Sequence, residues 1–245
     1  MRFTDKVIIV TGAAGGIGMA IARRFASEGA RIVLADLDGD ALKKAVPDIK
    51  KAGAPDVWPS ICDVSNEQQV EATVKGAFDK FGRLDVIVNN AGLMQFKALD
   101  ELTGDDWMRI LNVDLMGAFY FTKHAFLTMK PGGCIVNVSS IHAIETEPLV
   151  APYAAAKAAV LSLTRSSALE GKARGIRINA VLPGAIDTPM LWDNPNVKRG
   201  VEKIDKADVG RPEDVAATIA YLASDDAAFV QGAEIRVDGG RLDRL

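Results

Sequence analysis

The sequence is poor in the residue types that build disulfide frameworks and metal centres. Among 245 residues it contains two cysteines, Cys62 and Cys134, and two histidines, His124 and His142. Two cysteines are too few for a disulfide framework or a thiolate metal site, and two histidines do not form a histidine-rich metal centre. The sequence therefore predicts no metal site.

Long apolar runs and a large net charge are also missing. No segment approaches the ~18 consecutive apolar residues of a membrane span, and residues 1–6 lead into an apolar strand without the features of a signal peptide. The formal net charge of −3 gives no electrostatic reason to bind nucleic acid or an anionic membrane. With 49% hydrophobic and 25% charged residues, the composition predicts a soluble, cytoplasmic protein with a full core.

The chain does contain short β-branched runs that alternate with longer segments of helical periodicity. Strands are predicted over residues 7–10, 31–35, 86–88, 134–138, 176–182 and 234–237, and helices over 16–28, 40–51, 70–81, 103–129, 153–173 and 213–223. Such alternation gives parallel strands joined by right-handed crossovers, with helices on both faces of the sheet. It predicts an α/β fold with a doubly wound parallel sheet, as one domain over 1–245. The polar stretch at about 189–208 is too short for a domain and is predicted to be a loop or lid.

A glycine-rich turn lies between the first predicted strand and the first predicted helix. The candidate residues of this turn are Gly12, Gly15, Gly16, Ile17 and Gly18. Glycines permit a tight turn and let backbone N–H groups approach a pyrophosphate, which the helix N-terminus further stabilises. The position of the turn favours a dinucleotide site over an ordinary glycine-rich connection.

Asp36 ends the second predicted strand, where an acidic side chain can accept hydrogen bonds from ribose hydroxyls and repel a 2′-phosphate. No lysine or arginine lies in the glycine turn or directly after Asp36. A solvated turn aspartate would give the same pattern. The location nevertheless favours NAD over NADP as the cofactor.

Tyr153 and Lys157 lie four residues apart in a predicted helix, and so on the same helical face. A free phenol has a pKa near ~10 and is a poor base at neutral pH, but a neighbouring ammonium favours the phenolate. A tyrosine tuned in this way can take a proton from an alcohol, or return one to a carbonyl, while a hydride moves elsewhere. The same spacing also occurs by chance on exposed helices.

The chain resembles the classical short-chain dehydrogenase/reductase family over essentially its whole length. The resemblance is carried, in order, by residues 11–18, 89–92, Ser140, Tyr153 with Lys157, 183–184 and 237–240. It implies a Rossmann-type fold, a small alcohol or carbonyl substrate, and Tyr153 as the general acid/base. Lys157 would lower the pKa of Tyr153 and hold the nicotinamide ribose, and Ser140 would hydrogen-bond the substrate oxygen.

The resemblance also implies a set of cofactor contacts. It places Asp63 and Val64 against the adenine, and the remaining contacts along the ribose, nicotinamide and pyrophosphate, namely Asn90, Ala91, Gly92, Pro183, Gly184, Ile186 and Thr188. Some of these residues have plain structural alternatives. Asn90 can stabilise the turn after its strand, and Asp63 can cap a helix.

One position departs from the family pattern. Asp114 stands where the family usually has an asparagine that supports a water chain from the lysine to solvent. Asn112 lies about 200° away around a helix and cannot take the same direction. Asp114 can hold the water through its backbone carbonyl, or its carboxylate can pair with Lys157 and weaken the effect of that lysine on Tyr153. We expect activity to be retained, since a carboxylate also accepts hydrogen bonds from water.

The residues expected near the substrate are less specific. By resemblance the pocket lies among Met94, Gln95, the stretch 141–152 and a lid that carries Trp192. His142, Gln95 and the two glutamates of that stretch favour a polyhydroxylated substrate, although a loop histidine or glutamate is also commonly solvated. Trp192 can cover the pocket or pack against its own chain.

The sequence leaves three functions open. The leading hypothesis is an NAD-dependent dehydrogenase of a secondary alcohol that is sugar- or polyol-like. A 3-oxoacyl-(acyl-carrier-protein)-type reductase is an alternative, which Asp36 disfavours because reductive enzymes usually take the phosphorylated cofactor. A catalytically silent NAD-binding sensor or scaffold is the alternative from another class, and only Asp114 supports it. Small residues on the helix of Tyr153 suit close packing between copies, so we expect a homotetramer or homodimer.

Overall fold

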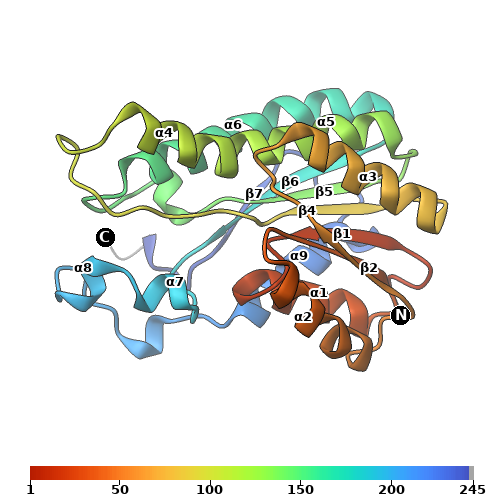
Figure 1. Cartoon of the computed structure of the whole chain (residues 1–245), viewed down its shortest axis with the longest axis horizontal. Helices are drawn as coiled ribbons and strands as arrows, with labels where there is room; N and C mark the ends of the chain where they lie inside the picture. Colours follow the sequence, from red (N-terminus) through yellow and green to blue (C-terminus); the bar gives the residue numbers. More distant parts are fainter. Residues whose placement is uncertain (243–245) are drawn as a thin grey trace.

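A central sheet lies between two layers of helices in the computed structural model, which describes residues 1–242 (Figure 1). Within these residues seven parallel strands pair in the order β3-β2-β1-β4-β5-β6-β7. The strands are β1 (Val7–Thr11), β2 (Arg31–Asp36), β3 (Val57–Ile61), β4 (Val86–Asn89), β5 (Cys134–Val138), β6 (Arg177–Pro183) and β7 (Glu234–Val237). The strand order reverses between β1 and β4, as in a doubly wound sheet. The predicted fold class is confirmed.

The helices divide between the two faces of the sheet (Figure 1). One face carries α1 (Gly16–Ser27), α2 (Gly39–Lys51) and α9 (Pro212–Ala223). The other carries α3 (Glu67–Phe81), α4 (Gly104–Leu111), α5 (Gly117–Thr128) and α6 (Ala151–Arg174). Among residues 1–242, none of the helices has both the length and the apolarity needed to cross a membrane.

Two hydrophobic cores follow from the alternation of side chains along the buried strands. In β1, Ile8 and Val10 belong to the core beneath α1 and α9, whereas Val7 and Ile9 belong to the core beneath α3 and α5. All four side chains are fully buried. A strand that is apolar on both faces is expected where helices cover both sides of a parallel sheet. The uninterrupted run Val7–Thr11 therefore predicts its own position at the centre of the sheet.

Strand β3 is not predicted from the sequence. It contains Pro59, and only Val57 and Ser60 of its five residues are buried. Proline is confined to edge strands, because it cannot donate a ladder hydrogen bond. The position of β3 at the edge of the sheet, paired to β2 alone, accounts for both features.

The single helix predicted over 103–129 is divided. Between α4 and α5 the chain forms η1 (Asn112–Met116), a short π-helical segment. Such segments are rare and frequently lie at functional sites. The 100° step per residue of an α-helix does not apply inside this segment, so the difference in direction between Asn112 and Asp114 stays a prediction. Asp114 lies in the segment and is 2% exposed.

The stretch predicted as a lid is not one continuous loop. It contains α7 (Pro189–Trp192), α8 (Pro195–Lys198) and the short helix η3 (Lys206–Asp208). Asn194 and Asn196 within it are 4% and 3% exposed. The stretch therefore packs against the rest of the protein through buried amides.

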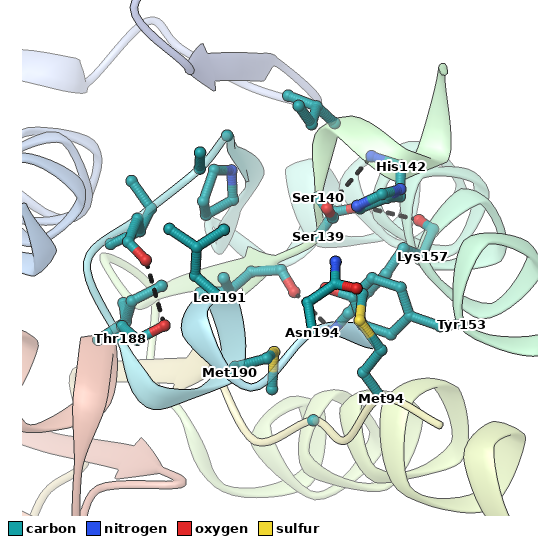
Figure 2. A pocket seen from close by; sticks show the side chains of 18 of the residues that line it. Met94, Ser139, Ser140, His142, Tyr153, Lys157, Thr188, Met190, Leu191 and Asn194 are labelled. Atoms are coloured by element: carbon teal, nitrogen blue, oxygen red, sulfur yellow. Dashed lines mark hydrogen bonds between the residues drawn. The ribbon is translucent and has the colours of Figure 1, made fainter. Parts of the chain in front are cut away.

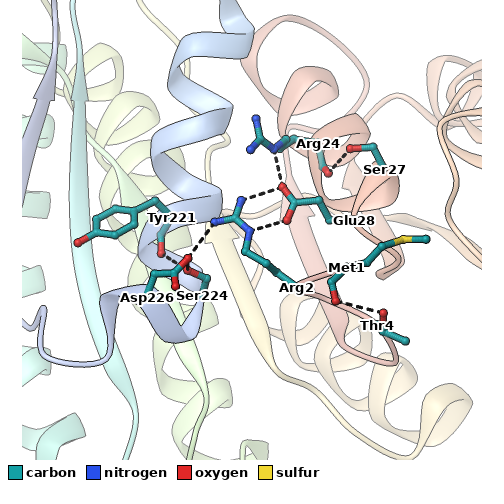
Figure 3. A network of polar contacts seen from close by, with 9 residues as sticks. All are labelled: Met1, Arg2, Thr4, Arg24, Ser27, Glu28, Tyr221, Ser224 and Asp226. Atoms are coloured by element: carbon teal, nitrogen blue, oxygen red, sulfur yellow. Dashed lines mark hydrogen bonds and ion pairs between the residues drawn. The ribbon is translucent and has the colours of Figure 1, made fainter.

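A polar network joins the start of the chain to two distant segments (Figure 3). Arg2 Nε donates to Glu28 Oε2 at 2.6 Å, and Arg24 Nε donates to Glu28 Oε1 at 2.6 Å. Arg2 Nη1 also lies 3.6 Å from Asp226 Oδ2, after the end of α9. Hydrogen bonding from Arg2 and Arg24 outweighs burial and lowers the pKa of Glu28.

Candidate active site

A cavity of about 710 Å³ opens at the carboxyl edge of the sheet. Its walls come from the turns that follow β1, β4, β5 and β6, together with the lid and the end of the chain. Ligands of open α/β sheets bind in this position, outside the carboxyl ends of the strands where the strand order reverses. Figure 2 shows ten labelled residues around it.

The glycine turn after β1 leaves the N-terminus of α1 free to bind an anion. Gly15 is the N-cap of α1 and supplies no side-chain cap, so the first N–H groups of the helix have no side-chain acceptor there. Gly12 has a φ of +61°, and a Cβ at this position would lie 3.0 Å from the Ala91 Cα. A Cβ on Gly18 would lie 2.0 Å from the Gly12 carbonyl oxygen. These glycines allow close backbone packing, and the turn fits a pyrophosphate.

The turn is held to β4 by side-chain hydrogen bonds. Thr11 Oγ1 accepts from the N–H groups of Asn90 and Ala91, both at 2.9 Å. The Asn90 amide donates to the Thr11 carbonyl at 2.9 Å and to the Gly12 carbonyl at 3.3 Å. Asn90 thus fixes the two turns that meet at the point of strand reversal, and it also lines the cavity.

Most of the predicted cofactor residues line this cavity. They are Gly12, Gly15, Gly16, Ile17, Asn90, Ala91, Gly92, Tyr153, Lys157, Pro183, Gly184, Ile186 and Thr188. Gly18 and Val64 do not, since Gly18 packs α1 onto the turn and Val64 packs against Gly117. Their roles in binding stay predictions.

The two predicted acidic cofactor residues lie outside the cavity lining. Asp36 Oδ2 accepts from the Ala14 N–H at 3.0 Å, which places the carboxylate beside the glycine turn. Asp63 Oδ1 accepts from the N–H and the hydroxyl of Ser65. Asp63 is not the cap of α3, which is Asn66. Contacts of Asp36 and Asp63 with a cofactor stay predictions.

Ser140, Tyr153 and Lys157 are brought together in the cavity, and all three are buried. Lys157 Nζ lies 5.5 Å from the centre of the Tyr153 ring and donates to the Val138 carbonyl at 3.2 Å. A hydrogen bond from Ser139 Oγ to the Lys157 carbonyl, at 2.8 Å, joins the end of β5 to α6. Ser139 is therefore occupied structurally, which leaves Ser140 as the hydroxyl beside Tyr153.

Burial has the largest effect on the phenol of Tyr153 and raises its pKa. The Lys157 charge opposes this effect, the Asp114 carboxylate adds to it, and a hydrogen bond with Ser140 opposes it. The net direction is upward from the ordinary value. A positively charged nicotinamide beside the phenol would act in the same direction as Lys157.

Asp114 forms a buried ion pair with Lys157. Its Oδ2 lies 3.1 Å from Lys157 Nζ, and its Oδ1 accepts from the Leu93 N–H at 2.9 Å. Burial alone would lower the pKa of Lys157, but the Asp114 carboxylate and Tyr153 outweigh it and raise that pKa. Burial raises the pKa of Asp114, and Lys157 and the Leu93 N–H oppose it. Of the two arrangements open for Asp114, the structure shows the carboxylate pair.

Gly92 makes room for this pair. A Cβ on Gly92 would lie 2.9 Å from Asp114 Oδ2 and 3.0 Å from Lys157 Nζ. Any larger residue would push against one of two buried charged groups. The glycine after β4 is thus required by the close approach of side chains, independently of any cofactor contact.

The substrate end of the cavity contains some of the predicted residues and lacks others. Met94 and His142 line it, and the His142 ring lies edge-on to Tyr153 with centroids 5.8 Å apart. The Gln95 amide donates to Asp106 at 2.7 Å, and the Trp192 indole donates to Asp187 at 2.7 Å. Among the described lining residues neither Gln95 nor Trp192 occurs. Trp192 packs against its own chain, and both substrate assignments stay predictions.

Three lining residues of this end are not found by sequence reasoning. Asn194 and Glu202 come from the lid, and Arg241 comes from the end of the chain. Asn194 precedes Pro195 and caps α8, a pattern that predicts a helix start and no contact with a ligand. No local signal in the sequence identifies Glu202 or Arg241.

Comparisons with known proteins place this site in a family. A family model described as enoyl-(acyl carrier protein) reductase matches residues 12–241. The chain is 42% identical to meso-2,3-butanediol dehydrogenase of Serratia marcescens over 98% of its length and 96% of that protein. It is 43% identical to cis-4-hydroxycyclohexanecarboxylate dehydrogenase of Sinomonas cyclohexanicum, with 97% of each chain covered. The crystal structure of levodione reductase superposes with a TM-score of 0.93 at 34% identity, covering 100% of both chains.

The chain belongs to the short-chain dehydrogenase/reductase family. It is accordingly an oxidoreductase that interconverts alcohols and ketones with a nicotinamide cofactor. Two features fit this cofactor. They are the N-terminus of α1, which has no side-chain cap, and the turns after β1 and β4, which Asn90 joins by a hydrogen bond to the Thr11 carbonyl.

Replacing Asp114 with asparagine tests the electrostatic role of the ion pair. Asp114→Asn keeps an acceptor for the Leu93 N–H and removes a negative charge that raises the pKa of Tyr153. In the general-base role expected of Tyr153 the deprotonated phenol is the active form, so a lower pKa moves the acid limb of log kcat/KM for alcohol oxidation to lower pH. We expect this shift, with a similar fold and similar maximal turnover, in a pH profile at saturating cofactor.

The control for this experiment is Asp79→Asn, which removes the same charge from an exposed position on α3. It should leave the profile unchanged. A shift of the acid limb of Asp114→Asn to higher pH would contradict the assigned electrostatics. Complete loss of turnover would show that the carboxylate itself is required.

Proposed function

We propose that the protein is an NAD-dependent dehydrogenase that transfers a hydride between a secondary alcohol, sugar- or polyol-like, and NAD. The observation that carries the proposal is the cluster of Ser140, Tyr153 and Lys157 in the same cavity as the glycine turn. The similarity to a butanediol dehydrogenase at 42% identity supports an alcohol with more than one hydroxyl group. The lid over 189–208 is proposed to close over the substrate.

The residues divide the work of alcohol oxidation. Ser140 holds the substrate hydroxyl, and Tyr153 as phenolate removes its proton as the carbinol carbon loses a hydride. A bound NAD would supply the hydride acceptor, so the alcohol would be oxidised to a ketone and one proton would be left on Tyr153. Lys157 lowers the cost of the phenolate form, and its buried position keeps water from screening the charge.

The cofactor preference follows from Asp36. Its carboxylate ends β2 beside the glycine turn, where it would accept hydrogen bonds from the ribose hydroxyls and repel a 2′-phosphate. Residues 37 and 38 are leucine and aspartate, so no cation is adjacent to neutralise a phosphate. Asp36 also counts against a 3-oxoacyl-(acyl-carrier-protein)-type reductase, although the chain is 39% identical to such an enzyme of Thermotoga maritima.

We also propose that copies of the chain associate as a homotetramer or homodimer. Large apolar side chains are exposed on the outer faces of α4, α5 and α6, including Met108, Leu127 and Leu169. Exposed apolar surface of this kind is typical of an interface. The proposal would be contradicted if light scattering at micromolar concentration gave the mass of one chain. The cytoplasmic location stays a prediction.

Tyr153→Phe distinguishes an enzyme from a silent NAD-binding sensor. The variant removes the phenol oxygen and keeps the ring, which packs in a buried cluster with Ile110, Val150 and Ala156. We expect kcat for a turned-over alcohol to fall by about 10²- to 10⁴-fold, the range of general acid–base catalysis. NADH affinity, measured by fluorescence titration, should change little. A wild type that binds NADH but oxidises no alcohol, and a variant that behaves alike, would support the sensor.

Asp36→Ser tests the basis of cofactor choice. The wild type should show a higher kcat/KM with NAD than with NADP, by about tenfold or more, because one charge pair across partly screened solvent is worth about 1–4 kcal/mol. The variant should lose most of that preference. Asp38→Ser, a matched change two residues away, should retain it. A wild type with the higher kcat/KM for NADP would overturn the preference for NAD.

A further inference from the structure

We propose that the substrate cavity recognises a second hydroxyl group of the substrate through the carboxyl groups of Glu147 and Glu202. The substrate would then be a diol on a hydrocarbon frame, with one hydroxyl at Tyr153 and the other at this pair. The inference rests on the proposed function, since it presumes that an alcohol reacts at Tyr153.

The two glutamates and the arginine that pairs with Glu202 come from three segments that are distant in sequence. Glu147 lies in the loop after Ser140, Glu202 lies in the lid, and Arg241 lies near the end of the chain. The Asn194 amide, which is 4% exposed, donates to Glu147 Oε1 at 2.7 Å and to Glu202 Oε2 at 3.4 Å. The Arg241 guanidinium donates to the remaining Glu202 oxygen. All four residues line the cavity.

This arrangement leaves hydrogen-bond capacity unused. Glu147 Oε2 is buried and has no hydrogen-bond donor among the described residues. A buried carboxyl oxygen without a donor is unfavourable, and a ligand hydroxyl that donates to it removes the penalty. Asn194 and Arg241 are already committed to the other oxygens, and the protonated Glu202 carboxyl hydrogen-bonds with Glu147, so the acceptor is open to a ligand hydroxyl when Glu202 is ionised.

The charge of the cluster favours a neutral donor over an ion. Burial, and then the neighbouring carboxyl of Glu147, raise the pKa of Glu202 to about 7 against the opposing charge of Arg241. Near neutral pH Glu202 is therefore only partly ionised, and the Arg241 guanidinium offsets part of the negative charge of the cluster. A substrate carboxylate would be a third acidic group in the same pocket and would be repelled, whereas an ammonium would lie beside the Arg241 guanidinium, which already pairs with Glu202.

The remaining walls point to a hydrocarbon frame. Six further lining residues have apolar side chains, namely Met94, Pro148, Met190, Leu191, Val201 and Leu242. His142 is partnered, with Nδ1 3.2 Å from Thr146 Oγ1, and burial lowers its pKa, so it adds no charge. A fully hydroxylated sugar would bury several hydroxyl groups against these walls without partners. A diol places its two hydroxyls where partners exist.

The same contacts could serve only to fasten the lid to the loop after Ser140. A fastening contact would affect every substrate alike, whereas a recognition contact changes the ratio between substrates. A set of substrates on one ring separates the two roles. The set is cyclohexanol, the 1,2-, 1,3- and 1,4-cyclohexanediols, 4-aminocyclohexanol and 4-hydroxycyclohexanecarboxylate, assayed by NADH formation at saturating NAD.

In the wild type we expect at least one diol to exceed cyclohexanol in kcat/KM by about tenfold or more, the worth of one hydrogen bond to a carboxyl group. The difference should lie mainly in KM. The hydroxy carboxylate should be poorer than cyclohexanol, and the amino alcohol should not exceed the best diol. Glu147→Gln and Glu202→Gln should each reduce the diol-to-cyclohexanol ratio several-fold. Glu101→Gln removes an exposed carboxylate elsewhere and should keep the wild-type ratio.

Several results would overturn the inference. These are a wild type without preference for any diol, a preference for the amino alcohol, or a ratio unchanged in both glutamine variants. An equal loss for all substrates would assign the pair to lid fastening alone. The wild-type ranking requires no variant, so it stands even if a substitution impairs folding. If cyclohexanol is oxidised and requires Tyr153, the proposed function holds whatever the diol ratio. If no alcohol is oxidised, the proposed function fails together with the inference.

Discussion

A buried cation beside a buried phenol is the interaction on which the site depends. Lys157 and Tyr153 both lie in the protein interior, where burial alone would lower the pKa of the lysine and raise that of the tyrosine. Each shift opposes acid–base chemistry at neutral pH. Asp114, 3.1 Å away, adds to the stability of the charged lysine, and this charge in turn favours the phenolate. Asp114 therefore supports the cation and opposes the phenolate at once, and its direct effect on Tyr153 is to raise the pKa of the phenol.

The fold could be predicted from the sequence wherever burial was uniform. Strands such as β1 and β5 are apolar on both faces and are bounded by turns. Strand β3 could not be predicted, since an edge position tolerates Pro59 and exposes alternate residues. The π-helical segment around Asp114 also lacks a periodic signal, because the apolar residues on either side continue at helical spacing.

The cluster of Tyr153 and Lys157 could be predicted from the sequence and the cluster around Glu147 and Glu202 could not, for a physical reason. Tyr153 and Lys157 lie on one turn of one helix, so their spacing is encoded locally. Glu147, Glu202 and Arg241 instead come from three separate segments of the chain. In the sequence each of them has the pattern of a solvated surface charge. Only tertiary packing shows that Asn194 joins them while 4% exposed.

The account is tested most directly by the pKa of Tyr153 in two variants that differ only in the cation. Asp114→Asn and the double variant Asp114→Asn/Lys157→Met both lack the carboxylate, so a comparison isolates the lysine. The pKa can be followed by NMR of tyrosine labelled with ¹³C at Cζ, and Tyr153→Phe assigns the signal among the three tyrosines of the chain. The account predicts a higher Tyr153 pKa in the double variant. Equal pKa values in the two variants would contradict it.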